Sequence, residues 1–195
     1  MPTLLPQSTP FTGRGTSDLG SLTHGLIGSH IQFLSDGQVP SNLLERMYAV
    51  AYALIEANPN ATRVLATEAA SLAFRYLTEF PPRPPWRLLG VEYDTGEGPV
   101  DLAWANTSTN EMFFDEVKTS RVATGRQVPS AWLAQTRRYA AAGAAAMGES
   151  FLGVRLVPLM AADTARLVRH GEPVRLLAHT AEAPLRLAAR SGGGR

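Results

Sequence analysis

A proline-rich break at residues 81–85 divides the chain into two parts with different hydrophobic periods. Each proline fixes the backbone φ angle and lacks an N–H, so a regular helix cannot continue through this segment. Before the break, apolar residues recur at helical spacing over about residues 42–58 and again over about 60–80. After it, the pattern changes to short alternating segments typical of strands. This change of period predicts a fold that combines helices with a β-sheet.

The part after the break predicts three strands, then a helix, then a fourth strand. Turn-rich residues separate the three strands, which are expected at 86–93, 99–105 and 111–119. Pro129 and Ser130 open an alanine-rich helix that ends near Gly148. The remaining chain predicts a strand at 151–159, a short helix at 163–170, a strand-like segment at 173–178 and a final short helix. This order favours an α/β fold with a mixed central sheet flanked by helices on both faces.

The length of 195 residues fits one sizeable domain. Residues 1–40 are rich in Gly, Ser, Thr and Pro, and we interpret them as an irregular N-terminal arm that docks on the core or on a partner. Residues 41–190 are predicted to form the domain, and residues 191–195 a flexible tail. No apolar run reaches the length of a membrane span, and the N-terminus lacks the pattern of a secretory signal, which predicts a cytoplasmic protein without membrane contact.

The composition restricts the kinds of site that the chain can build. It contains no cysteine, which excludes disulfides, thiolate metal sites and a cysteine nucleophile. The four histidines show no ligand spacing, and we interpret each as a structural or surface residue. A metal ion would therefore be bound by oxygen ligands, which favours Mg²⁺, Mn²⁺ or Ca²⁺.

The basic residues are seventeen arginines and a single lysine, Lys118. Such a ratio indicates that arginine has replaced lysine wherever either residue serves. A lysine that persists against this bias marks a position where a compact ammonium, rather than a planar guanidinium, is required.

Lys118 belongs to a group of residues that the strand geometry brings together. Glu116 and Lys118 are two apart in a predicted strand, so their side chains leave the same face, while Val117 points into the opposite, apolar layer. Asp101 is near the start of the preceding strand and can converge with them. Two carboxylates and the Val117 carbonyl form a hard oxygen site for Mg²⁺, and an adjacent ammonium can stabilise a hydroxide or a phosphate.

Asp101 followed by Glu116-Val117-Lys118 resembles the signature of the PD-(D/E)XK nuclease superfamily. The order of predicted elements resembles its restriction-endonuclease-like αβββαβ core. Gln135 and Tyr139, four apart on the alanine-rich helix, resemble the QxxxY motif of the RecB-type and lambda-exonuclease-like branch. The resemblance implies a deoxyribonuclease that uses Mg²⁺ or Mn²⁺, with Asp101, Glu116 and Lys118 as its catalytic residues.

The resemblance also implies further site residues. Gln135 and Tyr139 would line the substrate and metal site. Many members carry an acidic ligand on a helix before the strands, and Glu68 is the best match, with Glu56, Glu79 and Glu92 as alternatives. The proline of the signature is replaced by Val100, which changes no chemistry.

Charge is distributed unevenly around the predicted site. Residues 92–116 contain seven acidic and no basic residues, whereas residues 117–148 contain five basic and no acidic ones. A carboxylate-rich metal centre beside a cationic strip suits a phosphodiester backbone. We therefore expect Arg121, Arg137 and Arg138 to contact DNA.

Two alternatives of other classes stay open. One is a nuclease-fold subunit that serves nucleic-acid binding or complex assembly without cleavage. The other is an RNase or a toxin effector on the same core. The sequence contains no helicase or specificity domain, so we expect a protein partner or a homo-oligomer within a larger DNA-processing or antiviral defence system.

Overall fold

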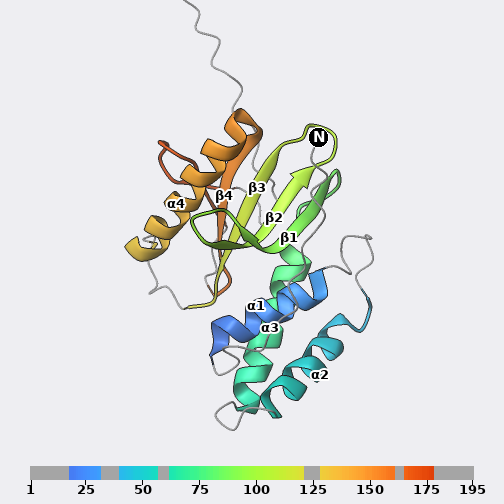
Figure 1. The fold of residues 1–195 in the computed structure, drawn as a ribbon. Helices are drawn as coiled ribbons and strands as arrows, with labels where there is room; N and C mark the ends of the chain where they lie inside the picture. The colour runs from blue at the N-terminus through green and yellow to red at the C-terminus, as the bar shows by residue number, and fades with distance from the viewer. Residues whose placement is uncertain (1–17, 32–39, 57–61, 121–127, 161–164, 178–195) are drawn as a thin grey trace, which may run out of the picture.

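The computed structural model describes residues 18–31, 40–56, 62–120, 128–160 and 165–177. Figure 1 shows their arrangement in space. The helices are α1 (Leu19–His30), α2 (Leu43–Glu56), α3 (Arg63–Glu79) and α4 (Ser130–Met147), the last followed by a 3-10 turn at Gly148–Ser150. The strands are β1 (Trp86–Asp94), β2 (Pro99–Asn106), β3 (Met112–Lys118), β4 (Phe151–Pro158), β5 (Arg166–Val168) and β6 (Arg175–Leu176).

The strands form one six-stranded mixed sheet in the order β1-β2-β3-β4-β5-β6. Strands β1, β2 and β3 pair antiparallel, β3 and β4 pair parallel, and β4, β5 and β6 again pair antiparallel. The parallel pair requires a crossover connection, which contains α4. The expected α/β class with a mixed sheet is confirmed, and the elements from α3 to β4 follow the predicted order of helix, three strands, helix and strand.

Helix α4 lies alongside β4, and α1, α2 and α3 lie together below the sheet in the view of Figure 1, so that helices pack against both faces of the sheet. Strand β3 shows the alternation that makes this possible, because its successive side chains point to opposite faces. Phe113 and Val117 pack in one apolar cluster with buried residues of α1, α2 and α3. Phe114 packs in a second cluster with Tyr139 and Ala140 of α4. The site residues of β3 therefore lie between two packed layers.

A buried ion pair holds the face of β3 that is turned toward α3. Asp115 Oδ1 accepts a hydrogen bond from Arg155 Nε and Asp115 Oδ2 one from the Arg155 guanidinium, each at 2.6 Å. Asp115 also accepts from the Tyr76 hydroxyl at 2.6 Å and from the Trp104 indole at 2.9 Å. Arg155 donates in addition to the Phe80 carbonyl at 2.8 Å. This network joins α3, β2, β3 and β4 through groups that are hydrogen-bonded to one another, as buried charges require.

Several predicted boundaries agree closely with the structure. The predicted helix over about 60–80 corresponds to α3, whose N-cap Thr62 accepts a hydrogen bond from the Leu65 N–H. The alanine-rich helix ends at Gly148, which adopts a φ of 58°, a conformation that glycine reaches without a steric cost.

Two predictions are corrected. Residues 19–30, expected to belong to an irregular arm over 1–40, form helix α1, which begins at the N-cap Asp18 and buries Leu22 and Leu26 against the other helices. Packing of this apolar face offsets the low helix propensity of its glycines. The short helix expected at 163–170 is wrong, because Arg166–Val168 form strand β5, which pairs with β4 and is buried. The expected final short helix and the 191–195 tail lie outside the described residues.

Within the described residues, no helix is both long and apolar enough to cross a membrane.

Candidate active site

The site lies at a fork where β2 and β3 separate. The two strands pair from Ala105–Met112 to Leu102–Asp115, and no pair follows at Asp101. Beyond this point the Asp101 side chain replaces the backbone hydrogen bonds between the two strands, because its Oδ2 accepts a hydrogen bond from the Val117 N–H at 2.6 Å. One carboxylate of β2 is thereby fixed against the backbone of β3 beside Glu116.

Glu116 and Lys118 share one face of β3, as the strand period predicts. Lys118 Nζ donates to Glu116 Oε1 at 2.6 Å and to Gln135 Oε1 of α4 at 2.8 Å. Gln135 Nε2 in turn donates to the Tyr139 hydroxyl at 3.1 Å. A connected chain of hydrogen bonds across β3 and α4 therefore links Glu116, Lys118, Gln135 and Tyr139.

Helix α1 contributes a residue that the sequence interpretation missed. His24 Nδ1 lies 3.0 Å from Asp101 Oδ1. The helix can approach the sheet this closely because glycines flank His24 on the same helix face. A Cβ on Gly28 would lie 3.0 Å from Val91 Cγ1, and one on Gly20 would lie 3.3 Å from Thr119 Oγ1. The i, i+4 spacing of Gly20, His24 and Gly28 was the signal in the sequence that could have identified this face.

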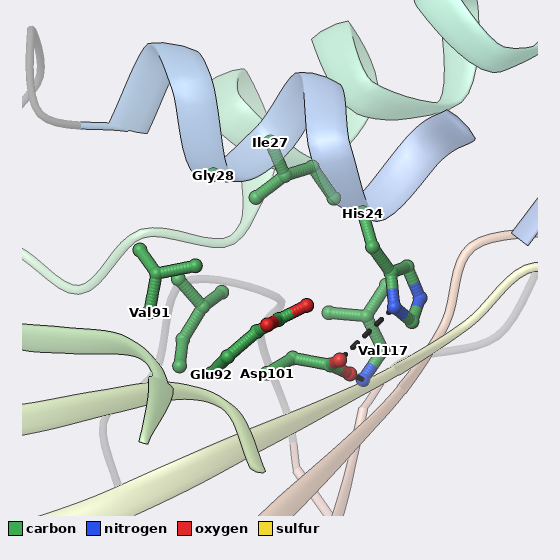
Figure 2. Close-up of a pocket in the computed structure, with 8 residues that line it drawn as sticks. His24, Ile27, Gly28, Val91, Glu92, Asp101 and Val117 are labelled. Carbon is green, nitrogen blue, oxygen red and sulfur yellow. Dashed lines mark hydrogen bonds and ion pairs between the residues drawn. The ribbon is translucent and has the colours of Figure 1, made fainter. Parts of the chain in front are cut away.

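A small pocket opens between α1 and the ends of β1 and β2 (Figure 2). The pairs Val91–Leu102 and Tyr93–Val100 place Glu92 opposite Asp101 in the ladder. Figure 2 shows the side chains of Glu92, Asp101 and His24 around the same space. The full lining consists of His24, Ile27, Gly28, Val91, Glu92, Asp101, Leu102 and Val117.

Glu92 has a backbone conformation that is unusual for a residue with a side chain. Its φ is 46°, in the left-handed region that glycine favours. Residues held in this region are enriched at functional sites, where the surrounding structure maintains the strain. Glu92 adopts this conformation at the point where its carboxylate lines the pocket.

Burial and neighbouring charges both shift the pKa values of ionisable groups at the site. Burial, followed by the charge of Asp101, raises the pKa of Glu116 to about 7, although Lys118 and His24 partly offset both effects. Burial lowers the pKa of His24, but the charge and hydrogen bond of Asp101, together with the charge of Glu116, raise that pKa overall. Two carboxylates that repel each other across a partly buried space are a site that a bound cation would stabilise.

The residues present fit a hard divalent cation. Asp101, Glu92 and Glu116 offer carboxylate oxygens, and an imidazole such as that of His24 is a ligand for Mn²⁺ and other transition metals. In the described part of the chain, no three His, Asp or Glu side chains are already arranged as a metal-binding group. Lys118 and the Val117 N–H hold the two central carboxylates instead, so an ion would have to compete with these two contacts.

The other predicted residues lie at different places. Glu68 is half-buried on α3 and does not line the pocket, so its role as a metal ligand stays a prediction. Arg137 and Arg138 are exposed on α4, the helix that carries Gln135. Arg121 lies outside the described residues. Asp115, one of the seven acidic residues counted around the site, is paired with Arg155 and adds no free charge there.

Comparisons with family models, with curated proteins and with solved structures find no match to this chain. Two carboxylates, an imidazole and one ammonium meet at a strand fork, with exposed arginines on the neighbouring helix.

Proposed function

We propose that this chain is a metal-dependent nuclease that hydrolyses DNA phosphodiester bonds with Mg²⁺ or Mn²⁺. The observation that carries the proposal is the meeting of Asp101, Glu116 and Lys118 at the fork between β2 and β3. Carboxylates attract a divalent cation, and an ammonium beside them attracts a phosphate. Metal-assisted hydrolysis of a phosphodiester uses both kinds of group near the reacting phosphate.

The metal ligands in this proposal are Asp101 and Glu116, with His24 and Glu92 at the side of α1 and β1. The carbonyl of Val117 is the further ligand predicted from the sequence. A bound Mg²⁺ would polarise the phosphate and lower the pKa of a coordinated water. Asp101 is held at the site by the Val117 N–H and by His24, and a bound ion would have to share or replace these contacts.

Lys118 has the role of a charge-stabilising group. Its ammonium is held beside Glu116 and can place positive charge against the phosphate as negative charge develops during attack by water. Arg137 and Arg138 supply contacts to the DNA backbone from the exposed face of α4. These contacts position the strand without reading its sequence.

A cleavage assay tests the proposal. Supercoiled plasmid, a single-stranded DNA oligonucleotide and a matching RNA are incubated with Mg²⁺, Mn²⁺, Ca²⁺ or EDTA. We expect cleavage of DNA with Mg²⁺ and Mn²⁺ and none with EDTA. Asp101→Asn and Glu116→Gln should each abolish it, and Asp101→Asn retains an oxygen that can accept from the Val117 N–H.

The outcomes separate the three functions under consideration. Cleavage of RNA alone would replace the DNase by an RNase on the same site. Binding of DNA without cleavage under every metal condition would overturn the nuclease proposal in favour of a binding or assembly role. Activity in either variant equal to that of the wild type would remove the assignment of the site.

A further inference from the structure

The orientation of Lys118 is determined by groups on two different elements. An ammonium has three N–H donors and no acceptor. Two of the donors are used by Glu116 Oε1 at 2.6 Å and Gln135 Oε1 at 2.8 Å. Since the three N–H bonds are arranged tetrahedrally, fixing two of them also fixes the direction of the third.

The contact with Lys118 also fixes the amide of Gln135. Only the amide oxygen can accept from an ammonium, so the amide nitrogen must face away from Lys118. It faces the Tyr139 hydroxyl, to which it donates at 3.1 Å. The Gln135 side chain is therefore held at both ends, with one end at the lysine and the other at the tyrosine.

Tyr139 is anchored in the core rather than presented to a ligand. Its exposed fraction is 4%, and it packs in the cluster that lies between the sheet and α4. The turn between β1 and β2 closes against it, because a Cβ on Gly98 would lie 3.5 Å from the Tyr139 hydroxyl oxygen. The Tyr139 hydroxyl contacts the end of the Gln135 amide that is turned away from Lys118. It can therefore influence Lys118 only through its hydrogen bond to Gln135.

We propose that Gln135 and Tyr139 are positioning residues that aim the third N–H of Lys118 at the reacting phosphate. The inference rests on the proposed nuclease function and replaces the substrate-binding role that the sequence suggested for these two residues. Gln135 and Tyr139 are four apart on α4, so the packing of one helix holds both in place. Glu116 holds the lysine from the side of β3.

The single lysine of the chain makes this arrangement directly measurable. Protein labelled with ¹⁵N-lysine gives one side-chain ammonium signal, which belongs to Lys118. Its ¹⁵N relaxation in metal-free protein reports how strongly the ammonium is ordered, whether or not the protein cleaves DNA. We expect Gln135→Leu and Tyr139→Phe to increase its motion. Gln135→Glu should preserve its order, because a carboxylate oxygen also accepts from the ammonium.

The matched control is Tyr93→Phe. Tyr93 packs in the same cluster as Tyr139, and the change removes a hydroxyl of the same kind. This variant should leave both the ammonium signal and cleavage unchanged. A general loosening of the cluster would instead appear in both tyrosine variants.

Kinetics provide the second readout. Gln135→Leu and Tyr139→Phe should lower kcat by about 10-fold, as loss of an outer hydrogen-bond partner commonly does, while KM and the affinity for DNA in Ca²⁺ stay unchanged. An ammonium that stays ordered in both variants overturns the inference. Weakened DNA binding with an ordered ammonium also overturns it and restores a substrate-binding role.

The nuclease proposal can fail independently of this positioning. Suppose that the variants increase the motion of the Lys118 ammonium while the wild-type protein cleaves no nucleic acid. The positioning of Lys118 by Gln135 and Tyr139 is then confirmed, and the proposed nuclease reaction is excluded.

Discussion

His24 Nδ1 lies 3.0 Å from Asp101 Oδ1 and connects helix α1 to strand β2 at the fork that contains the candidate site. The contact joins residues that are distant in the sequence. It makes His24 a partner of the carboxylate that is itself fixed by the Val117 N–H. Because of this contact, we expect His24 to take part in metal binding.

His24→Ala should weaken Mn²⁺ binding by about 10-fold or more, because ligands and their direct partners contribute on this scale. Isothermal titration calorimetry of the purified protein measures the affinity. His170→Ala is the matched control, since His170 is exposed on the surface.

Glu68→Gln, measured in parallel with Glu56→Gln and Glu79→Gln, tests the ligand predicted from the sequence. If Glu68→Gln weakens binding and His24→Ala does not, the ligand lies on α3.

Because its pKa is raised, Glu116 should make the free energy of unfolding of the metal-free protein depend on pH. Its pKa is about 7 in the folded protein and near the ordinary glutamate value of about 4.3 in the unfolded chain. Between these values the folded state keeps a proton that the unfolded state has lost, so this residue lowers the free energy of unfolding as the pH rises. Glu116→Gln removes the effect and should gain stability relative to the wild type between pH 4.5 and pH 8.

Denaturant unfolding in EDTA at both pH values measures this difference. The comparison between variant and wild type cancels the contributions of titrating groups that do not interact with Glu116, whereas Asp101, His24 and Lys118 interact with it. A difference that is constant across the two pH values would show that Glu116 titrates normally.

Removing Arg155 should destabilise the protein strongly. The guanidinium and the Asp115 carboxylate are both fully buried, and loss of one partner leaves the other as an uncompensated charge. We expect Arg155→Met to cost about 3–5 kcal/mol in unfolding free energy. The double variant Asp115→Leu with Arg155→Met should cost less than the sum of the two single changes, because it leaves no unpaired charge.

The half-exposed pair Arg75–Glu79 provides the control for this experiment. Glu79→Gln should cost less than about 1 kcal/mol, as is typical of surface ion pairs. Equal costs for Arg155→Met and Glu79→Gln would mean that the buried network does not hold the sheet as described.

Lys118→Arg tests whether an ammonium is required at this position. The Lys118 Nζ fits between Glu116 Oε1 and Gln135 Oε1, and its side chain is only 17% exposed. A planar guanidinium is longer and would displace one of these contacts. We expect cleavage to fall by at least about 100-fold, the usual contribution of a positioned charge-stabilising group. Affinity for DNA, measured by fluorescence anisotropy in Ca²⁺, should stay unchanged because the charge is kept. Cleavage at the wild-type rate would show that any cation suffices.

Arg137→Ala and Arg138→Ala should weaken DNA binding equally for different sequences. Each change removes a backbone contact, so the slope of the logarithm of affinity against the logarithm of salt concentration should decrease by about 1 per arginine. Affinity is measured over a series of salt concentrations with two unrelated oligonucleotides. An unchanged slope would assign these exposed arginines to solvation of α4.

Features that depend on a local backbone period could be predicted from the amino-acid order. Glu116 and Lys118 meet on one face because side chains of a strand alternate, and Gln135 reaches Tyr139 because residues four apart share a helix face. The proline-rich break and the glycine after α4 set element boundaries through their own backbone preferences.

Which distant residues share the site depends instead on how the elements pack in three dimensions. His24 was interpreted as a surface or structural residue, yet the close approach of α1 places it on Asp101. Asp115 was counted with the acidic residues of the site, yet Arg155 pairs with it on the opposite face of β3. Such contacts depend on how whole elements pack, and packing is set by side-chain volumes and close approaches between segments far apart in the chain, which no local period encodes.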